Sequence, residues 1–516
     1  MHACLNVDEI IRFIASQLVA SGAKETAVSL ASYCKSFEDP VLDTLWEAQN
    51  PLLPLLESLP GGVWNEGGCV VSVPTTCVFF SLNCLVSKSF RRFPAPPEWA
   101  RFRKYARRMR KLIEHDALDF LSPQVFEVLR LCAINEPLFP NLRAVQLGSA
   151  SGSCIPFIPL FLSPRTAAIR ITFANPRKEA VAWMIATFPK LCPNLQDIGL
   201  HALPRDPMIT AAVSEMLLAT NRNALRSIYV DSPLTEEAHE MIYGLTGLRE
   251  VSVSIEGGIP VPPVVFPDLV RLVIKYDHDD DGLRMFRGAT FGKLEAVTFY
   301  PDSEQIGDFL EAFEKVGLAA SIQNTLSELH IFALCPWNPK YPSLLPFTQL
   351  TNLVIEFACE DVCASSVDDD IITSLARAMP KMEAIYLGGP PCPEIPIGVT
   401  VKGLAILAHH CPYLITLRIH FQLASLFTPP AISGTVSNVE HTTPGRECVL
   451  AELDVGEIPM PGESVLMVAL TLARIFPNID HIDYADENWR TVVDAIHLSG
   501  RIVDYSSEEH PLYALN

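Results

Sequence analysis

The pattern of apolar and polar positions predicts a long array of short strands over most of the chain. From residue 142 onward a run of the form Leu-x-x-apolar-x-apolar recurs at intervals of about 21 to 36 residues. The alternating apolar positions of each run predict a strand with one buried face. The runs lie at 142–147, 168–173, 195–200, 225–230, 248–253, 269–274, 294–299, 326–331, 350–355, 382–387, 414–419, 450–455 and 479–484.

Helical segments fill the gaps between these runs. They are predicted at 178–190, 208–219, 235–245, 303–316, 371–378, 401–409 and 462–474. Many close with a proline turn such as Pro140-Asn141 or Pro193-Asn194, in which the proline stops the helix and the Asn turns the chain into the next strand. One strand and one helix per repeat predict a curved α/β solenoid with a parallel sheet, in the spacing range of irregular leucine-rich repeats.

The first fifty residues have a different pattern, which predicts three short helices. In the first, Ile10, Ile14 and Leu18 recur every four residues, and the helix is expected to end near Gly22. The second covers about 24–37 and is expected to stop before Pro40, and the third covers 42–46. Three short helices bury only a small core, so this unit needs a neighbour.

The same segment resembles the F-box of a large group of fungal F-box proteins. The matching residues are Cys4, Leu5, Glu9, Ile10, Ile14, Leu18, Leu30, Ala31, Cys34, Lys35, Phe37, Pro40 and the run 42–46, followed by Trp64, Trp99 and the run 102–108. The resemblance covers about the first 115 residues. F-boxes usually place a proline just before the acid that opens the first helix, and this sequence has none between Leu5 and Glu9.

The resemblance implies that the chain is the substrate-recognition adaptor of a cullin-RING ubiquitin ligase of the SCF type. The helical unit would dock on a Skp-type adaptor, and through it on a cullin, while the solenoid binds a protein target. The implied adaptor contacts are Leu5, Glu9, Ile10, Ile14, Leu18, Leu42 and Trp46. The alternative is a plain helical cap on a leucine-rich-repeat scaffold or binding protein that has no ligase association.

We therefore expect an α/β chain with an F-box-like unit at 1–50 and a linker with a basic helix at 51–115. A leucine-rich-repeat-like solenoid at 116–490 and a cap or tail at 491–516 would follow. Residues 66–90 form an extra apolar stretch, for which a buried strand pair, a true insertion and an artefact of gene prediction remain open.

Charge narrows the choice of partners. The chain has 39 Lys and Arg against 59 Asp and Glu, a formal net charge of −20, which argues against nucleic acid. One exception is 88–111, with ten basic residues and a single acid. Either Arg101, Lys104, Arg108 and Lys111 form a phosphate-binding stripe, or the basic face of a linker helix lies against the acidic body or stays solvated. We favour the second, with Trp99, Phe102 and Tyr105 turned inward.

A target is expected on exposed positions of the predicted sheet. The early repeats place arginines there, whereas later repeats place acids such as Glu328 and Glu452. The candidate target-binding residues are Arg143, Arg226, Arg249 and Arg271.

The sequence contains no recognisable set of catalytic residues, so we predict a protein that is not an enzyme and that has no metal or cofactor. Residues 277–282 imitate the start of a calcium loop but lack the bidentate acid at position 288. His409-His410-Cys411 lacks a second ligand pair for zinc. The run 148–153, rich in Gly and Ser, lacks the lysine of a phosphate-binding loop and is expected to be a flexible turn.

The expected location is the cytoplasm or nucleus. Fourteen scattered cysteines do not form a secreted disulfide pattern, and the acidic first residues do not match an export signal. The uncharged stretch at 67–87 contains Pro74 and Asn83, so no membrane span is expected.

Overall fold

The structure is a computed structural model, and it consists of two compact units, Met1–Ser254 and Ile255–Asn516. The residues that it describes are 8–49, 52–65, 89–114, 121–134, 136–255, 263–276, 289–301, 322–333, 344–357, 367–388, 398–427, 448–456, 458, 460–484 and 486–507.

The first unit contains helices α1 to α9 and strands β1 to β7. The helices are α1 Asp8–Ala20, α2 Lys24–Tyr33, α3 Lys35–Glu47, α4 Leu53–Glu57, α5 Pro96–Ala106, α6 Pro123–Cys132, α7 Lys178–Leu191, α8 Pro207–Ala219 and α9 Glu236–Tyr243. The strands are β1 Ala48–Gln49, β2 Lys111–Glu114, β3 Ala144–Ser151, β4 Ala168–Ala174, β5 Asp197–His201, β6 Ser227–Val230 and β7 Glu250–Ile255. Short 3-10 helices lie at Gly61–Val63 and Ile155–Phe161.

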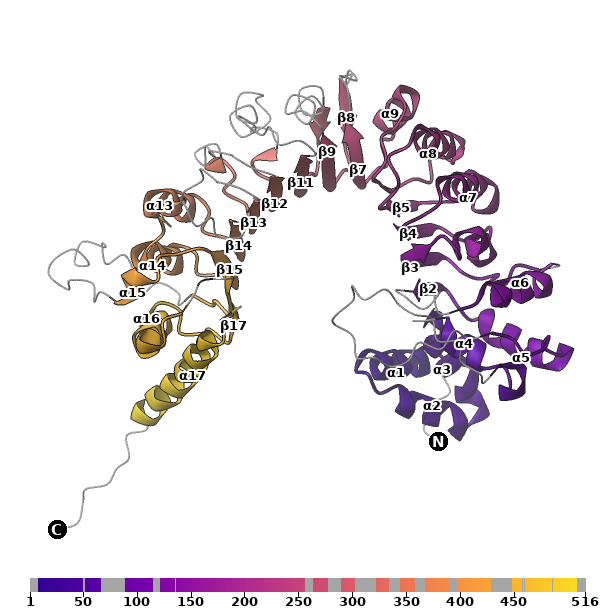
Figure 1. Cartoon of the computed structure of the whole chain (residues 1–516), viewed down its shortest axis with the longest axis horizontal. Helices are drawn as coiled ribbons and strands as arrows, with labels where there is room; N and C mark the ends of the chain where they lie inside the picture. The colour runs from indigo at the N-terminus through magenta and orange to yellow at the C-terminus, as the bar shows by residue number, and fades with distance from the viewer. Residues whose placement is uncertain are drawn as a thin grey trace, which may run out of the picture. The chain divides into compact units, whose positions relative to one another are not determined.

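The strands of the first unit form a parallel sheet in chain order, each strand paired with the next. Figure 1 shows strands β2 to β5 on one side of this unit and helices α6 to α9 on the other. The register aligns the buried positions of successive repeats, so that Val145 pairs with Ile169 and Ile169 pairs with Ile198. The core therefore lies between the sheet and its helices.

The leading leucine of each repeat explains why the layers stack. Leu142, Leu195, Leu225 and Leu248 are each buried just before their strands. Each fully buried leucine contributes about 1.5–3 kcal/mol of hydrophobic stabilisation. The repeat leucines therefore belong to the packing of the solenoid and do not belong to a binding surface.

The second unit repeats this arrangement. Its main strands are β9 Arg271–Tyr276, β11 Ala296–Pro301, β12 Glu328–Ala333, β13 Asn352–Phe357, β14 Ala384–Leu387, β15 Thr416–Ile419, β16 Glu452–Gly456 and β17 His481–Tyr484, parallel and in that order. Its helices are α13 Asp369–Ala378, α14 Val401–His410, α15 Ala424–Phe427, α16 Val465–Ile475 and α17 Asn488–Ser507, with a 3-10 turn at Gly462–Ser464. A small parallel pair joins β8 Val264–Phe266 to β10 Ala289–Phe291.

The predicted α/β fold, a set of N-terminal helices followed by an irregular leucine-rich-repeat-like solenoid with a parallel sheet, is confirmed. Each predicted run corresponds to one strand of the two units, and most strands begin two residues after the leading leucine. The predicted helix at 303–316, the calcium-like loop and most of the apolar stretch at 66–90 lie outside the described residues.

Three local predictions are wrong. The break between α2 and α3 lies at Cys34, whose backbone is extended, and Pro40 is buried inside α3. Residues 148–151 are not a turn, because they continue β3 through an irregularity in its pairing with β4. The sheet also begins earlier than predicted, at β1 and β2, because Leu112 is buried directly after the basic helix.

Candidate functional site

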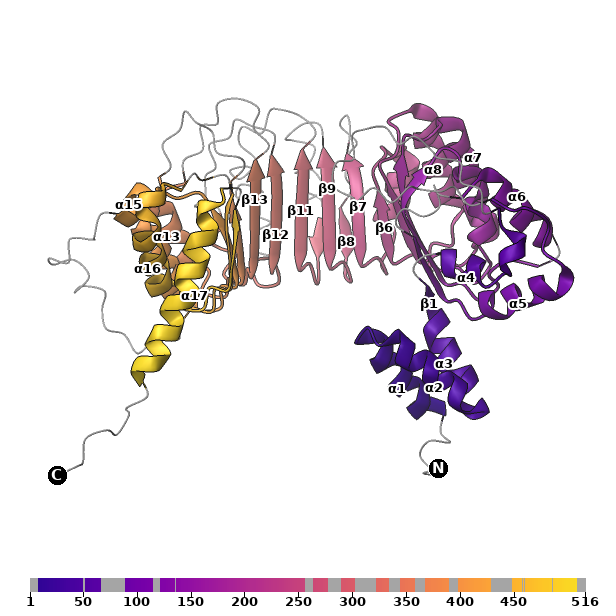
Figure 2. The same cartoon turned by 60° about the horizontal axis from the view of Figure 1, so that its bottom comes forward.

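Helices α1, α2 and α3 form a small bundle with a core of its own. Figure 2 shows the three helices gathered at the amino end of the first unit. The buried residues are Ile11, Ala15, Ala27, Ala31, Phe37 and Val41, with Leu18, Leu30, Cys34, Leu42 and Leu45 packed against them. The turn after α1 needs a left-handed backbone at Gly22 (φ 79°), and the Ala23 N–H donates to the Leu18 carbonyl at 2.8 Å.

The outer flank of α1 consists of Ile10, Phe13 and Ile14, which lie on one side of the helix because they are three and four positions apart. Ile10 is 37% exposed, Phe13 is 64% exposed and Ile14 is half-buried. The opposite side of α1, with Ile11 and Ala15, is sealed in the bundle core. Within the described residues, the helices that pack against α1 are α2 and α3.

The structure brings together only part of the predicted adaptor-contact set. Glu9 is exposed at the start of α1, and Ile10 and Ile14 lie on the outer flank. Leu18 and Leu42 instead pack against the core of the bundle. The remaining two are Leu5, which lies outside the described residues, and Trp46, which stacks on Tyr105 of α5 with ring centroids 4.8 Å apart.

Phe13 is the most exposed apolar residue of α1, and the sequence analysis did not select it. The signal was available, because Phe13 lies three positions after Ile10 and one before Ile14. A strict four-residue spacing selected Leu18 instead, which turns toward the core.

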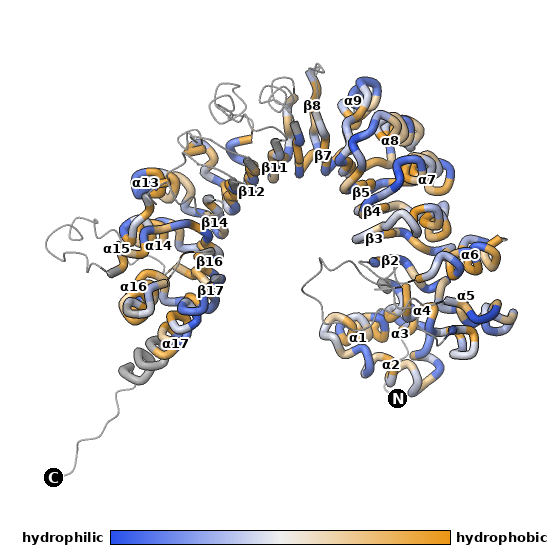
Figure 3. Tube along the Cα trace, in the orientation of Figure 1, coloured by the Kyte–Doolittle hydropathy of each residue, from blue (hydrophilic) through white to orange (hydrophobic). Residues whose placement is uncertain are grey.

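Helix α5 fastens the bundle to the start of the solenoid through charged contacts. Arg108 donates to the carboxylates of both Asp39 and Asp43 on α3, and Lys104 pairs with Glu38 at 2.9 Å. Figure 3 shows the α5 trace as mostly hydrophilic. The large apolar residues buried in α5 are Trp99 and Phe102, and those buried just after it are Met109 and Leu112. Lys104 and Arg108 therefore lie against an acidic helix, whereas Arg101 and Lys111 are exposed, so both forms of the favoured interpretation occur along this segment.

The first turn of α5 is held by Glu98, which accepts from the Ala95 N–H at 2.6 Å and pairs with Arg92 at 2.7 Å. The hydrogen bonds from Arg92 and from the Ala95 N–H lower the pKa of Glu98 to about 2. This carboxylate is ionised at neutral pH and fixes the entry of the helix.

The sheet face of the first unit carries a polar cluster on β4 to β7. Arg170 lies over the ring of Tyr229 at 5.9 Å, and Tyr229 donates to Glu250 at 3.1 Å. Gly199 lies between them, and a Cβ there would meet the Arg170 Cγ at 2.9 Å. Burial raises the pKa of Asp197, which lies two strands from Glu250.

Three of the candidate target-binding arginines precede their strands. Arg143, Arg226 and Arg249 are exposed at the amino edge of the first sheet, where the Arg249 N–H donates to the Arg226 carbonyl at 2.7 Å. Arg226 and Arg249 are thus backbone neighbours. The residues on the face of the sheet are the third and fifth of each repeat motif, such as Gln146 and Tyr229, because the fourth and sixth are buried.

The fourth candidate, Arg271, begins β9 in the second unit and pairs with Glu328 at 3.4 Å. Further along that sheet, Arg418 lies over the Tyr386 ring at 4.7 Å and pairs with Asp454 at 3.2 Å. The sheet face of this unit is therefore a mixed-charge surface.

No group of three or more His, Cys, Asp or Glu in the described residues could hold a metal ion. Cys411 is buried, and burial raises the pKa of its thiol to about 12, so it is a core residue. No helix within the described ranges is long and apolar enough to cross a membrane.

Comparisons with known proteins find structural likeness only. No family model matches the chain, and no curated protein matches it. A chain in the crystal structure of the Rad7 and Elc1 complex in yeast is 18% identical, with 58% of this chain and 77% of that chain covered and a TM-score of 0.38. The leucine-rich repeat-containing protein LegL7 from Legionella pneumophila is 8% identical, with coverages of 78% and 99% and a TM-score of 0.26. At these values neither likeness bears on what this chain binds.

Proposed function

We propose that this chain is the substrate-recognition adaptor of a cullin-RING ubiquitin ligase, in which the helical bundle docks on a Skp-type adaptor and the solenoid binds a protein target. It would act without an active site of its own. Its contribution is proximity, because holding the target beside the ligase raises the effective concentration of a target lysine. Such a ligase works in the cytoplasm or nucleus, where we place the chain.

The observation that carries this proposal is the outer flank of α1. Ile10 and Phe13 are exposed at 37% and 64% although the other side of the same helix is buried. Burial of a large apolar side chain in an interface is worth about 1.5–3 kcal/mol before the cost of association. Together with the F-box-like sequence, this flank supports a partner of the Skp type.

One observation supports the alternative, a repeat scaffold without a ligase. The resemblance assigns Trp46 to the adaptor interface, but Trp46 stacks on Tyr105 of the same chain. The side of the bundle that carries α3 is therefore already covered by α5. The adaptor interface that we propose is correspondingly centred on α1.

Co-purification of the full chain with a Skp-type adaptor tests the proposal. Wild type should recover the adaptor, and Phe13→Asp should lose it, because an acid on the flank places an unpaired charge in an apolar contact. Leu42 is unsuitable for this test, since it packs against the bundle core and its substitution would disturb folding.

Trp183→Asp is the matched control. Trp183 is 56% exposed on α7, so this variant makes a similar change outside the bundle and should still recover the adaptor. Failure of the folded wild type to recover any adaptor would leave the scaffold alternative. Equal recovery by Phe13→Asp would remove α1 as the interface.

A further inference from the structure

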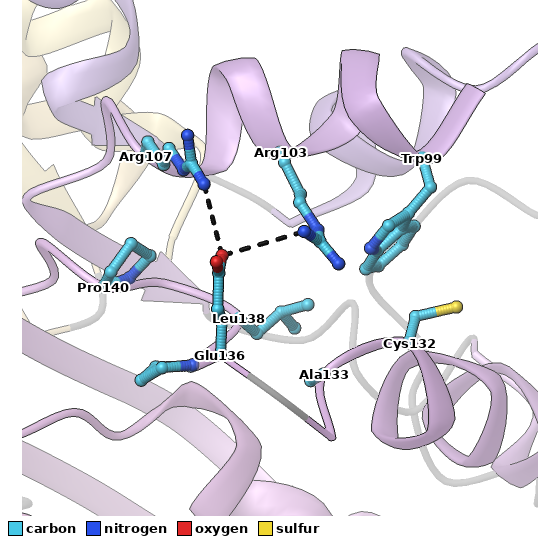
Figure 4. A pocket seen from close by; sticks show the side chains of 9 residues that line it. Trp99, Arg103, Arg107, Cys132, Ala133, Glu136, Leu138 and Pro140 are labelled. Carbon is cyan, nitrogen blue, oxygen red and sulfur yellow. Dashed lines mark hydrogen bonds and ion pairs between the residues drawn. The ribbon is translucent and has the colours of Figure 1, made fainter. Parts of the chain in front are cut away.

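A shallow depression, open to solvent, lies between α5 and the segment that joins α6 to β3. Figure 4 shows it lined by Trp99 and Arg103 of α5, by Arg107 directly after the helix and by Glu136 from the facing segment. The helical bundle instead pairs with Lys104 of α5 and with Arg108, which follows the helix. The depression therefore belongs to a different side of the helix.

The two arginines share one carboxylate oxygen. The Arg107 Nη2 and Arg103 Nη1 atoms lie 3.2 Å and 3.7 Å from the same Oε2 atom of Glu136. All three side chains are exposed by 39% or more, so solvent and solutes reach the pair. Two positive charges facing one negative charge leave a surplus of one.

A buried hydrogen-bond donor also lines the depression. Trp99 is 93% buried (7% exposed), and its indole N–H has no hydrogen-bond partner. Stacking on Phe102 at 4.5 Å fixes the ring, and in Figure 4 its nitrogen edge faces the Arg103 guanidinium.

Apart from Glu136, the charged and aromatic side chains that line the depression are therefore hydrogen-bond donors. A buried N–H without an acceptor is costly, so an acceptor oxygen at this place is favoured. A carboxylate supplies one negative charge, and Glu136 already provides it. A phosphate monoester supplies a charge of about −1.5 to −2 and three acceptor oxygens, which match two guanidinium groups and one indole N–H.

We propose that Arg103, Arg107 and Trp99 form a binding site for a phosphate monoester group carried by a phosphorylated serine or threonine of a protein segment, and that the Glu136 carboxylate occupies this site in its absence. The phosphoryl group displaces Glu136 from the arginines and directs one oxygen toward the indole N–H. This site is separate from the outer flank of α1 and does not depend on an adaptor role.

Titration of the full chain at low salt tests this site. The probes are a short Gly-Ala peptide with one central phosphoserine, the same peptide with unmodified serine, and inorganic phosphate. The phosphopeptide should bind at least about tenfold more tightly than its unmodified form. If inorganic phosphate binds as tightly as the phosphopeptide, a free anion is the ligand and the assignment to a protein segment is overturned.

The variants are chosen because they change affinity in opposite directions. Arg103→Ala with Arg107→Ala should weaken phosphopeptide binding at least about tenfold, whereas Glu136→Gln should strengthen it severalfold by removing the competing charge. Arg91→Ala with Arg101→Ala, an equal loss of charge at two exposed positions outside the site, should leave it unchanged within about twofold.

Two further results would overturn the proposal. One is equal binding of the phosphorylated and unmodified peptides by the wild type. The other is a Glu136→Gln variant whose affinity for the phosphopeptide is unchanged or lower, because ion pairs that merely tie α5 to the facing segment predict no gain. Glu136→Gln preserves side-chain shape, so it remains informative if the double arginine variant does not fold.

Discussion

Arg108 is the residue whose loss should most weaken the attachment of the helical bundle. Its side chain is 13% exposed and donates to the carboxylates of Asp39 and Asp43. It also donates to the Asp39 carbonyl at 3.2 Å. Arg108→Ala removes these bonds together.

The structure sets the size of the effect. An exposed ion pair contributes about 0–1 kcal/mol, and breaking a fully buried one costs about 3–5 kcal/mol. Arg108 is largely buried, but Asp39 is 73% exposed and Asp43 is 35% exposed, so water can replace the lost partner of both carboxylates. We therefore expect a loss of about 1–2 kcal/mol, roughly a 5- to 30-fold increase in local opening.

Amide hydrogen exchange is the suitable assay, because a chain of two compact units does not unfold in a single step. Exchange in α1, α2 and α3 should accelerate in Arg108→Ala, while exchange in α7 and α8 stays unchanged. Combining Arg108→Ala with Asp43→Ala should give a coupling free energy of about 1 kcal/mol.

Arg101→Ala provides the matched control, since Arg101 is exposed on α5, the helix that precedes Arg108. Exchange in the bundle that does not change in Arg108→Ala would refute the reasoning. Strictly additive effects of Arg108→Ala and Asp43→Ala would refute it as well, because they would show that the two side chains do not act on each other.

Three further substitutions have predicted effects. Asp197→Asn should stabilise the first unit at pH 7, as chemical denaturation would show, because burial raises the folded pKa of Asp197 and so penalises its ionised form. The difference from wild type should vanish below about pH 4, where the Asp197 carboxyl group is protonated in both the folded and the unfolded state. Glu98→Gln should destabilise the start of α5 at neutral pH, because it removes the carboxylate that accepts from Arg92 and the Ala95 N–H. Since the folded pKa of Glu98 is lowered to about 2, the difference from wild type should fade as the pH falls from about 4.5 toward 2, which circular dichroism against pH would show. Gly199→Ala should lower the denaturation midpoint by the equivalent of about 1–3 kcal/mol, because the new Cβ would meet Arg170 at 2.9 Å, and an unchanged midpoint would contradict this close approach.

The repeats were predictable because their apolar pattern is locally consistent. Leu195, Ile198 and Leu200 are all buried, and the same three positions are buried in the repeats that start at Leu225 and Leu248. A leading leucine with two alternating apolar residues has few other ways to bury its side chains, so the strand and its buried face follow from sequence alone.

The candidate surfaces were harder to predict, because they depend on rotation and on distant partners. Phe13 and Leu18 lie five positions apart in α1, about 140° apart around the helix axis, and tertiary packing decides which of them faces outward. The partners of Arg108 lie 65 and 69 positions away in the chain, which no local pattern reveals. Arg143 and Arg226 were expected on the sheet face, but they precede it, because the strands begin two residues after the leading leucine.

The central claim is that the outer flank of α1 binds a Skp-type adaptor, and a calorimetric titration of the purified adaptor into the full chain tests it most directly. We predict one-to-one binding with a negative heat-capacity change, which marks burial of apolar surface. Ile10→Asp with Phe13→Asp should weaken this binding at least about 100-fold, or about 2.7 kcal/mol. No binding by the folded wild type, or the same Kd for the double variant, would contradict the account.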